Sequence, residues 1–243
     1  MPGMSEWAAK RFWTAAKAEA VAGGFGVRLD GRAVRTPAKA ELVVPTRALA
    51  REIAAEWDAQ EGVIAPATMP MTRAANAAID RVAREREAVA ALLAEYGGSD
   101  LLCYRAESPA ELVARQAAAW DPLLDWAGSA LSARLRTTSG VMHVDQDAGA
   151  LGRLHEAVRL LDIWALTAFH DLVSLSGSLV IGFAALRDHA PADALWQVSR
   201  IDESWQHEQW GSDDEANAVA QRKECDFLNA KRFHDLSRPG AEG

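Results

Sequence analysis

The sequence predicts an α+β fold, in which a small N-terminal mixed α/β domain with an antiparallel hairpin sheet is followed by an all-α helical bundle domain. Two observations carry this prediction: strand signals are confined to residues 25–44, and helical periodicity covers nearly all of the chain after residue 72. We place the boundary near the charge run R-E-R-E at residues 84–87, which gives expected domains at residues 1–84 and 85–243. With 243 residues, the chain can bury a sizeable core.

The strand signals come first along the chain. Apolar residues alternate over residues 25–29, and the next two residues, Asp30 and Gly31, form a dipeptide typical of two-residue hairpin turns. We expect the chain to return as a strand at residues 33–35 and to add a third strand at residues 41–44.

A helix is expected after Thr46, because Leu49, Ile53 and Trp57 recur at every fourth residue. As the third member of this apolar stripe, Trp57 is most simply a core residue, although its indole N–H needs a hydrogen-bond partner. The neighbouring Asp58 is placed to order the loop that follows. We therefore expect structural roles for Trp57 and Asp58.

The second domain is expected to contain six or so helices. Asp147 is placed to cap a helix whose apolar residues recur at helical spacing. The segment of residues 163–186 is apolar on most sides, and we expect a core helix that breaks near Gly177. Its longest stretch without charge, residues 172–186, is shorter than the about 20 residues that cross a membrane, so we expect no membrane insertion.

Charge and motif content exclude several classes of function. A formal net charge of -8 argues against an electrostatic grip on nucleic acid or anionic lipid, so a basic or neutral protein partner suits the chain better. Neither a phosphate-binding glycine loop nor an H-E-x-x-H motif is present, and we expect no cofactor, no metal and no small-molecule substrate.

The expected location is the cytoplasm. The first residues hold neither the apolar core of a secretory signal nor the Arg- and Ser-rich character of a transit peptide. Cys103 and Cys225 lie far apart and match no metal-binding spacing, which favours a reducing compartment.

The most unusual stretch is S-R-I-D-E-S-W-Q-H-E-Q-W-G-S-D-D-E-A at residues 199–216. On a helical wheel, Trp196, Glu203 and Trp210 are spaced by seven and line one edge, so that a carboxylate lies between two large rings. Gly211 follows at the helix end and is expected to have a structural role. Tryptophans at a surface edge are typical of protein recognition, and the nine tryptophans of the chain favour a binding protein.

Two other interpretations of this stretch stay open. Asp202 and Gln206 fall on the otherwise apolar face of the wheel, where they could hydrogen-bond inside the bundle while Glu203 is solvated. Alternatively, Asp202, Glu203 and His207 could form the site of a small metal-dependent or acid/base hydrolase. Adjacent residues on a helix diverge by about 100°, so the two acids cannot act as a facing pair without a group from elsewhere.

Longer motifs indicate a family. They are R-F-W at 11–13, L-D-G-R-A-V-R-T-P-A-K at 29–39, E-W-D-A-Q at 56–60, M-P-M-T-R-A-A-N-A-A-I-D-R at 69–81, D-L-L-C-Y-R at 100–105, W-D-P-L-L-D-W at 120–126, G-S-L at 177–179 and D-E-x-x-Q-x-x-x-W-G at 202–211. With these motifs, in this order, the chain resembles the ATP-twelve family of F-type ATP synthase assembly chaperones. The resemblance extends from about Arg11 to Phe233, and several motifs run to ten residues.

The resemblance implies a non-enzymatic assembly factor with an α+β first domain and a helical second domain. Such a factor binds the unassembled alpha subunit of the catalytic sector, shields the surface later given to the beta subunit, and prevents aggregation. A glutamate in the D-E-x-x-Q region matters in the family, and the matching position is Glu203, with Asp202 next if the motif shifts by one residue. Trp57 is implied to matter for folding. The missing targeting extension fits a bacterial, cytoplasmic member.

The expected partner-binding residues are therefore Glu203, Asp202, Gln206, Trp196 and Trp210.

Overall fold

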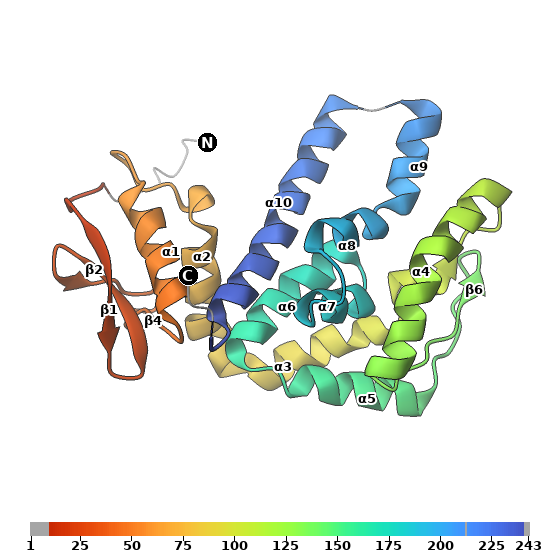
Figure 1. Cartoon of the computed structure of the whole chain (residues 1–243), viewed down its shortest axis with the longest axis horizontal. Helices are drawn as coiled ribbons and strands as arrows, with labels where there is room; N and C mark the ends of the chain where they lie inside the picture. Colours follow the sequence, from red (N-terminus) through yellow and green to blue (C-terminus); the bar gives the residue numbers. More distant parts are fainter. Residues whose placement is uncertain (1–9, 212, 241–243) are drawn as a thin grey trace, which may run out of the picture. The chain divides into compact units, whose positions relative to one another are not determined.

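The computed structural model of the chain describes residues 10–211 and 213–240 (Figure 1). Its contacts divide the chain into two compact units. One holds the residues up to Arg84 together with those from Asp235 onward, and the other is Glu85–His234. The first unit contains a small antiparallel sheet and the second is mostly helical, so the predicted fold class is confirmed. The domain limits predicted at 1–84 and 85–243 stay a proposal, and residues 1–9, from which the cytoplasmic location was inferred, lie outside the described part.

The sheet of the first unit is built on a long hairpin. Its strands are β1 (Ala16–Val21), β2 (Gly24–Leu29), β3 (Arg32–Ala33) and β4 (Val43–Val44), and β2 pairs antiparallel with the other three. The turn between β2 and β3 forms at Asp30 and Gly31, whose φ angles of 46° and 84° are the positive values of a hairpin turn that matches the twist of the strands. The predicted hairpin is thus confirmed. Strand β1 is an addition, since only Val21 in its sequence A-K-A-E-A-V is one of the branched and aromatic residues that indicate a strand.

Helices of the first unit cover the sheet and lead out of it. They are α1 (Arg47–Asp58), the short 3₁₀ turn η1 (Pro66–Thr68), α2 (Pro70–Ala77) and the π-helical turn η2 (Ala78–Val82). The hydroxyl of Thr46 accepts a hydrogen bond from the N–H of Leu49 at 3.1 Å, which is the predicted cap of α1. Buried Leu49 and Ile53 face the sheet, and Figure 1 shows α1 beside β1 and β2.

The second unit is a helical array with one short strand pair. Its elements are α3 (Ala83–Ala94, which begins in the first unit), η3 (Glu95–Gly98), η4 (Leu101–Cys103), β5 (Tyr104–Arg105), α4 (Ala110–Ala130), β6 (Thr138–Ser139), α5 (Ala148–Arg159), α6 (Ile163–Ser176), α7 (Leu179–Leu186), α8 (Ala192–Ser199), α9 (Ile201–Trp210) and α10 (Asp214–Ser237, which ends in the first unit). Strands β5 and β6 pair in parallel, which the prediction of an all-α domain did not include.

The apolar segment predicted from the sequence is the core of this unit. It forms α6 and α7, and every residue of α7 is buried. The chain breaks between them at Gly177, whose φ of 74° is the left-handed conformation that favours glycine, so the predicted break is confirmed. In the part of the chain that the structure describes, no helix is both long and apolar enough to cross a membrane.

Candidate functional site

Residues 196–210, which the wheel treats as one helix, belong to two. Helix α8 ends at Ser199 and α9 begins at Ile201, and Arg200 between them has non-helical angles, φ -110° and ψ 18°. A wheel drawn through both helices therefore gives wrong directions. Only 2% of Trp196 is exposed, and its ring packs on Phe227 with centroids 5.5 Å apart.

The predicted surface edge of Trp196, Glu203 and Trp210 is consequently wrong for Trp196. Trp210 is 79% exposed at the end of α9, whereas Trp196 lies in the core. Gln206, which the wheel placed on the apolar face, is exposed. Gly211 ends α9 with a φ of 85°, a conformation that suits glycine.

Arg200 contacts both Trp196 and Glu203, two of the three residues that the wheel placed on one edge. Its guanidinium carbon lies 5.0 Å from the centroid of the Trp196 ring, and its Nη1 lies 2.9 Å from Oε1 of Glu203. About half of the Glu203 side chain is exposed. Glu203 is thus a surface carboxylate held by an arginine that packs on a buried ring, and it stays accessible to a partner.

Asp202 has a different environment. Its Oδ1 accepts a hydrogen bond of 2.6 Å from Nε2 of Gln116 on α4, a side chain that is 1% exposed. The Oε1 of the same glutamine accepts the backbone N–H of Ala106 at 2.7 Å. Asp202 therefore hydrogen-bonds inside the bundle, as one of the interpretations above held, and fixes α9 to α4.

A second pair links the same two helices. Arg115 donates Nη1 and Nη2 to the two carboxylate oxygens of Glu208 at 2.8 and 3.0 Å, and its guanidinium carbon lies 5.2 Å from the ring centroid of Trp205. The hydrogen bonds from Arg115 lower the pKa of Glu208. No pattern in the sequence relates Arg115 and Gln116 to this site, because they lie about 90 residues earlier on another helix.

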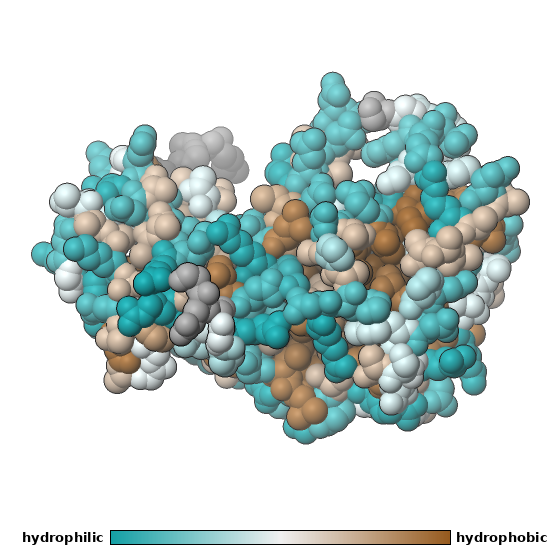
Figure 2. Space-filling view, viewed as in Figure 1, coloured by the Kyte–Doolittle hydropathy of each residue, from teal (hydrophilic) through white to brown (hydrophobic). Residues whose placement is uncertain are grey.

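Acidic residues are frequent along α9 and at the start of α10. Six carboxylates and one arginine lie between residues 200 and 215, and Figure 2 shows mostly hydrophilic side chains over the α9–α10 end. The described residues hold no group of three or more His, Cys, Asp or Glu side chains that could bind a metal ion. What this surface offers is therefore negative charge beside the exposed ring of Trp210, an arrangement suited to binding a protein.

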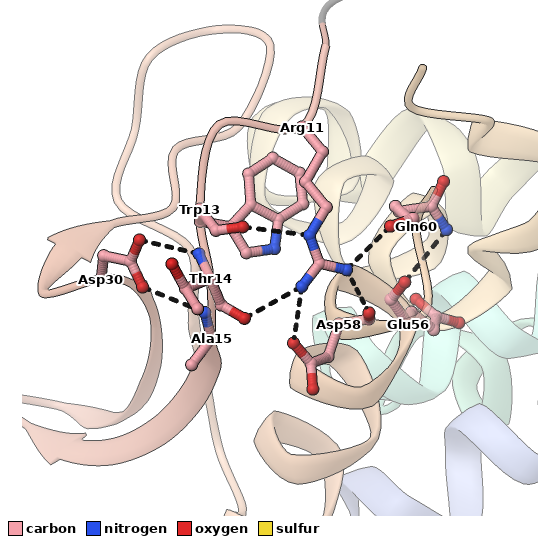
Figure 3. A network of polar contacts seen from close by, with 8 residues as sticks. All are labelled: Arg11, Trp13, Thr14, Ala15, Asp30, Glu56, Asp58 and Gln60. Atoms are coloured by element: carbon pink, nitrogen blue, oxygen red, sulfur yellow. Dashed lines mark hydrogen bonds and ion pairs between the residues drawn. The ribbon is translucent and has the colours of Figure 1, made fainter. Parts of the chain in front are cut away.

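Asp58, one of the structural residues predicted in the first unit, lies in a network of polar contacts (Figure 3). Arg11 donates Nη2 to Oδ1 of Asp58 at 3.2 Å and Nη1 to the backbone carbonyl oxygens of Asp58 and Gln60. Beside it, the rings of Trp13 and Trp57 meet edge to face with centroids 5.3 Å apart. Motifs R-F-W and E-W-D-A-Q are thus joined across this unit.

One detail of that network differs from the prediction. The buried Nε1 atoms of Trp13 and Trp57 have no hydrogen-bond partner among the described residues. The partner that we expected for the Trp57 indole is therefore missing from this part of the structure. The ring still packs against Trp13.

Glu56 extends the network to α2. Its carboxylate accepts the backbone N–H groups of Met71 and Thr72, at 2.6 and 2.8 Å, and the Thr72 hydroxyl at 2.6 Å. These are free donors at the start of α2, which has no side-chain cap of its own. Burial raises the pKa of Glu56 in spite of these bonds.

Comparisons with known proteins agree with the motifs. The family model described as ATP12 chaperone protein matches residues 10–128. The mitochondrial protein atp12 of Schizosaccharomyces pombe is 26% identical over 228 residues, which cover 86% of this chain and 76% of that protein.

Two crystal structures are also similar. Atp12 from Paracoccus denitrificans is 49% identical with a TM-score of 0.92, over 96% of this chain and 100% of that one. The Atu1473 protein from Agrobacterium tumefaciens is 40% identical with a TM-score of 0.90, over 94% of this chain and 86% of that one. The matching family is one of chaperones and not of enzymes, and nothing supports the hydrolase alternative.

Proposed function

Because the chain belongs to the ATP12 chaperone protein family, we propose that it is an assembly chaperone of the F-type ATP synthase whose client is the unassembled alpha subunit. The observation that carries this proposal is the similarity to Paracoccus denitrificans Atp12 over the whole of that chain. The protein is not an enzyme, and its task is to bind.

The proposed mechanism is competition for an interface. A subunit made before its neighbour exposes an apolar surface that promotes aggregation. A chaperone that covers this surface through a modest interface protects the subunit, and the beta subunit then displaces it because beta offers a larger complementary surface.

We place the client contact on α9. Glu203 supports this because it is accessible and forms an ion pair with Arg200, and Trp210 supports it because it is 79% exposed. Gln206 is exposed between them, and Asp202 fixes the helix through Gln116. Acids around an exposed aromatic ring suit a client surface whose apolar area has a basic rim.

The other predicted residues have supporting roles in this proposal. Trp196 positions Arg200, since the guanidinium packs on its buried ring. Trp57 and Asp58 stabilise the first unit, and Gly211 lets the chain leave α9. We place the protein in the bacterial cytoplasm, which is supported by its similarity to the Paracoccus and Agrobacterium structures.

Capture of the purified alpha subunit tests the function. Immobilised protein is expected to retain alpha and to lower its light scattering on heating, and added beta is expected to release alpha. Glu203→Lys should weaken capture, while Glu95→Lys, which reverses another exposed acid of the second unit, should not. Failure of the unmodified protein to retain alpha would reject the proposal, and unchanged capture by Glu203→Lys would remove α9 from it.

A further inference from the structure

Two adjacent apolar side chains are exposed on the second unit outside α9. Val141 is 95% exposed and Met142 is 76% exposed, and Gly140 separates them from the end of β6. Single exposed apolar residues are common on protein surfaces and need no explanation. Val141 and Met142 differ from such residues because the loop that carries them is held by several hydrogen bonds.

The loop of residues 136–146, here called the tip loop, is closed by a side chain at its base. Gln146 accepts the backbone N–H of Arg136 with Oε1 at 2.7 Å and donates Nε2 to the carbonyl oxygen of the same residue at 2.9 Å. Nearer the tip, the hydroxyl of Tyr104 lies 3.1 Å from Nδ1 of His143. The exposed residues are thus presented by a loop that is bonded at its base and beside its tip.

The tip loop is also bonded to the body of the unit. The N–H of Gly140 donates to the carbonyl oxygen of Arg105 at 2.8 Å, next to the pairing of β6 with β5. Nη2 of Arg105 lies 2.7 Å from Oδ1 of Asp121 on α4. Strand β5 therefore links the tip loop to α4 through Arg105.

Gln116 continues this connection to α9. It accepts the N–H of Ala106, the residue after β5, and donates to Asp202. A single buried amide therefore contacts both the chain directly after the strand that holds the tip loop and the helix that carries Glu203. The tip loop and α9 are consequently fixed relative to each other. A binding surface that uses both would need little reordering on association.

We propose that the tip loop is a second client contact. It inserts Val141 and Met142 into an apolar depression of the alpha subunit, and the acids of α9 bind the same subunit elsewhere. This inference rests on the proposed function and adds a binding element to it. Polypeptide suits the tip better than a membrane does, because residues 85–234 hold 23 Asp and Glu against 13 Lys and Arg and repel anionic lipid. Two side chains are too few for a stable dimer, which buries about 800 Å² per partner, so they supplement a larger interface.

Paired substitutions test the tip against a matched control. Val141→Ser with Met142→Ser removes the apolar side chains at exposed positions, and Leu92→Ser with Leu160→Ser does the same at residues that are 54% and 69% exposed elsewhere on the chain. Binding of purified alpha subunit is measured by titration calorimetry. The tip variant is expected to bind at least about tenfold more weakly, while the control binds like the unmodified protein.

Photocrosslinking supplies a second measurement. A benzoylphenylalanine at position 142 should crosslink to alpha, whereas one at position 160 should not. If the unmodified protein binds alpha but the tip variant binds equally well, or position 142 crosslinks no more than position 160, the inference is wrong while the proposed function stands. If the unmodified protein does not bind alpha, both are wrong. Crosslinking of position 142 only to a second copy of the chain would also overturn the inference.

Discussion

The buried carboxylate of Asp100 accepts a hydrogen bond of 2.8 Å from the hydroxyl of Ser178, which lies 78 residues later in the chain. Asp100 also accepts the N–H groups of Val180 and Leu102, each at 3.0 Å. Ser178 caps α7 by accepting the N–H of Ile181. The carboxylate therefore satisfies donors at the start of α7 and so joins the motifs D-L-L-C-Y-R and G-S-L in the core.

Asp100→Ala is expected to lower the free energy of unfolding by about 3 kcal/mol or more, because it leaves three buried donors without their acceptor. Urea denaturation measures the loss. Asp171→Ala, which removes a half-exposed carboxylate from α6, serves as the control and should cost within about 0.5 kcal/mol. Equal losses for the two variants would contradict the role given to Asp100.

Gly182→Ala is expected to destabilise the protein by about 1–3 kcal/mol, even though alanine favours helices. A Cβ atom at this position would lie 2.6 Å from Cγ2 of Val173 and 2.8 Å from Cε2 of Phe169, and both neighbours are fully buried. Gly152→Ala in α5 is the matched control, because a Cβ there meets nothing within 4 Å. Thermal unfolding should show the control to be at least as stable as the unmodified protein; a stable Gly182→Ala would mean that α6 and α7 are not tightly packed.

The pH dependence of stability should reveal the burial of Glu56. Because burial raises its pKa in the folded state above the ordinary value of 4.5, the folded state favours the protonated carboxyl group. The stabilising contribution is therefore present below the unfolded pKa and is lost as the pH rises toward the folded pKa.

Comparison with Glu56→Gln isolates this contribution, since the other titrating groups cancel. The difference in free energy of unfolding, taken as the unmodified protein minus the variant, is expected to fall as the pH rises above about 4.5. Urea denaturation across this range provides the values. A difference that grows with pH would show instead that the three hydrogen bonds to the carboxylate outweigh its burial.

Local signals were predictable from the sequence. The turn at Asp30 and Gly31, the cap at Thr46 and the break at Gly177 each depend on residues within a few positions, so their chemistry can be read directly. Strand β1 was missed because its alternating small and charged residues form a strand only beside β2.

The candidate site was less predictable, because its geometry depends on distant or unmarked residues. Neither glycine nor proline marks the break at Arg200. A wheel that treats the two helices as one therefore placed the buried Trp196 on the surface. The partner of Asp202 is Gln116, 86 residues earlier, and no local pattern relates the two. The motifs indicated α9 as the candidate site, while the tertiary contacts decide what each of its side chains can do.

Isosteric changes test which of the two adjacent acids makes the proposed contact with the client. Asp202→Asn keeps an Oδ1 that can accept the hydrogen bond from Gln116, so both stability and capture of alpha should stay close to those of the unmodified protein. Glu203→Gln removes an exposed charge whose ion pair with Arg200 contributes at most about 1 kcal/mol to stability, so its main effect should fall on capture.

We therefore expect Glu203→Gln to weaken binding of alpha several-fold at low salt and progressively less as salt rises, with an unchanged urea midpoint. Asp202→Ala provides the contrast, because it leaves the buried amide of Gln116 without its acceptor and should cost about 1–3 kcal/mol of stability. If Asp202→Asn instead weakens capture at full stability while Glu203→Gln does not, then the charge of Asp202 makes the contact, and Gln116 must release it when the client binds.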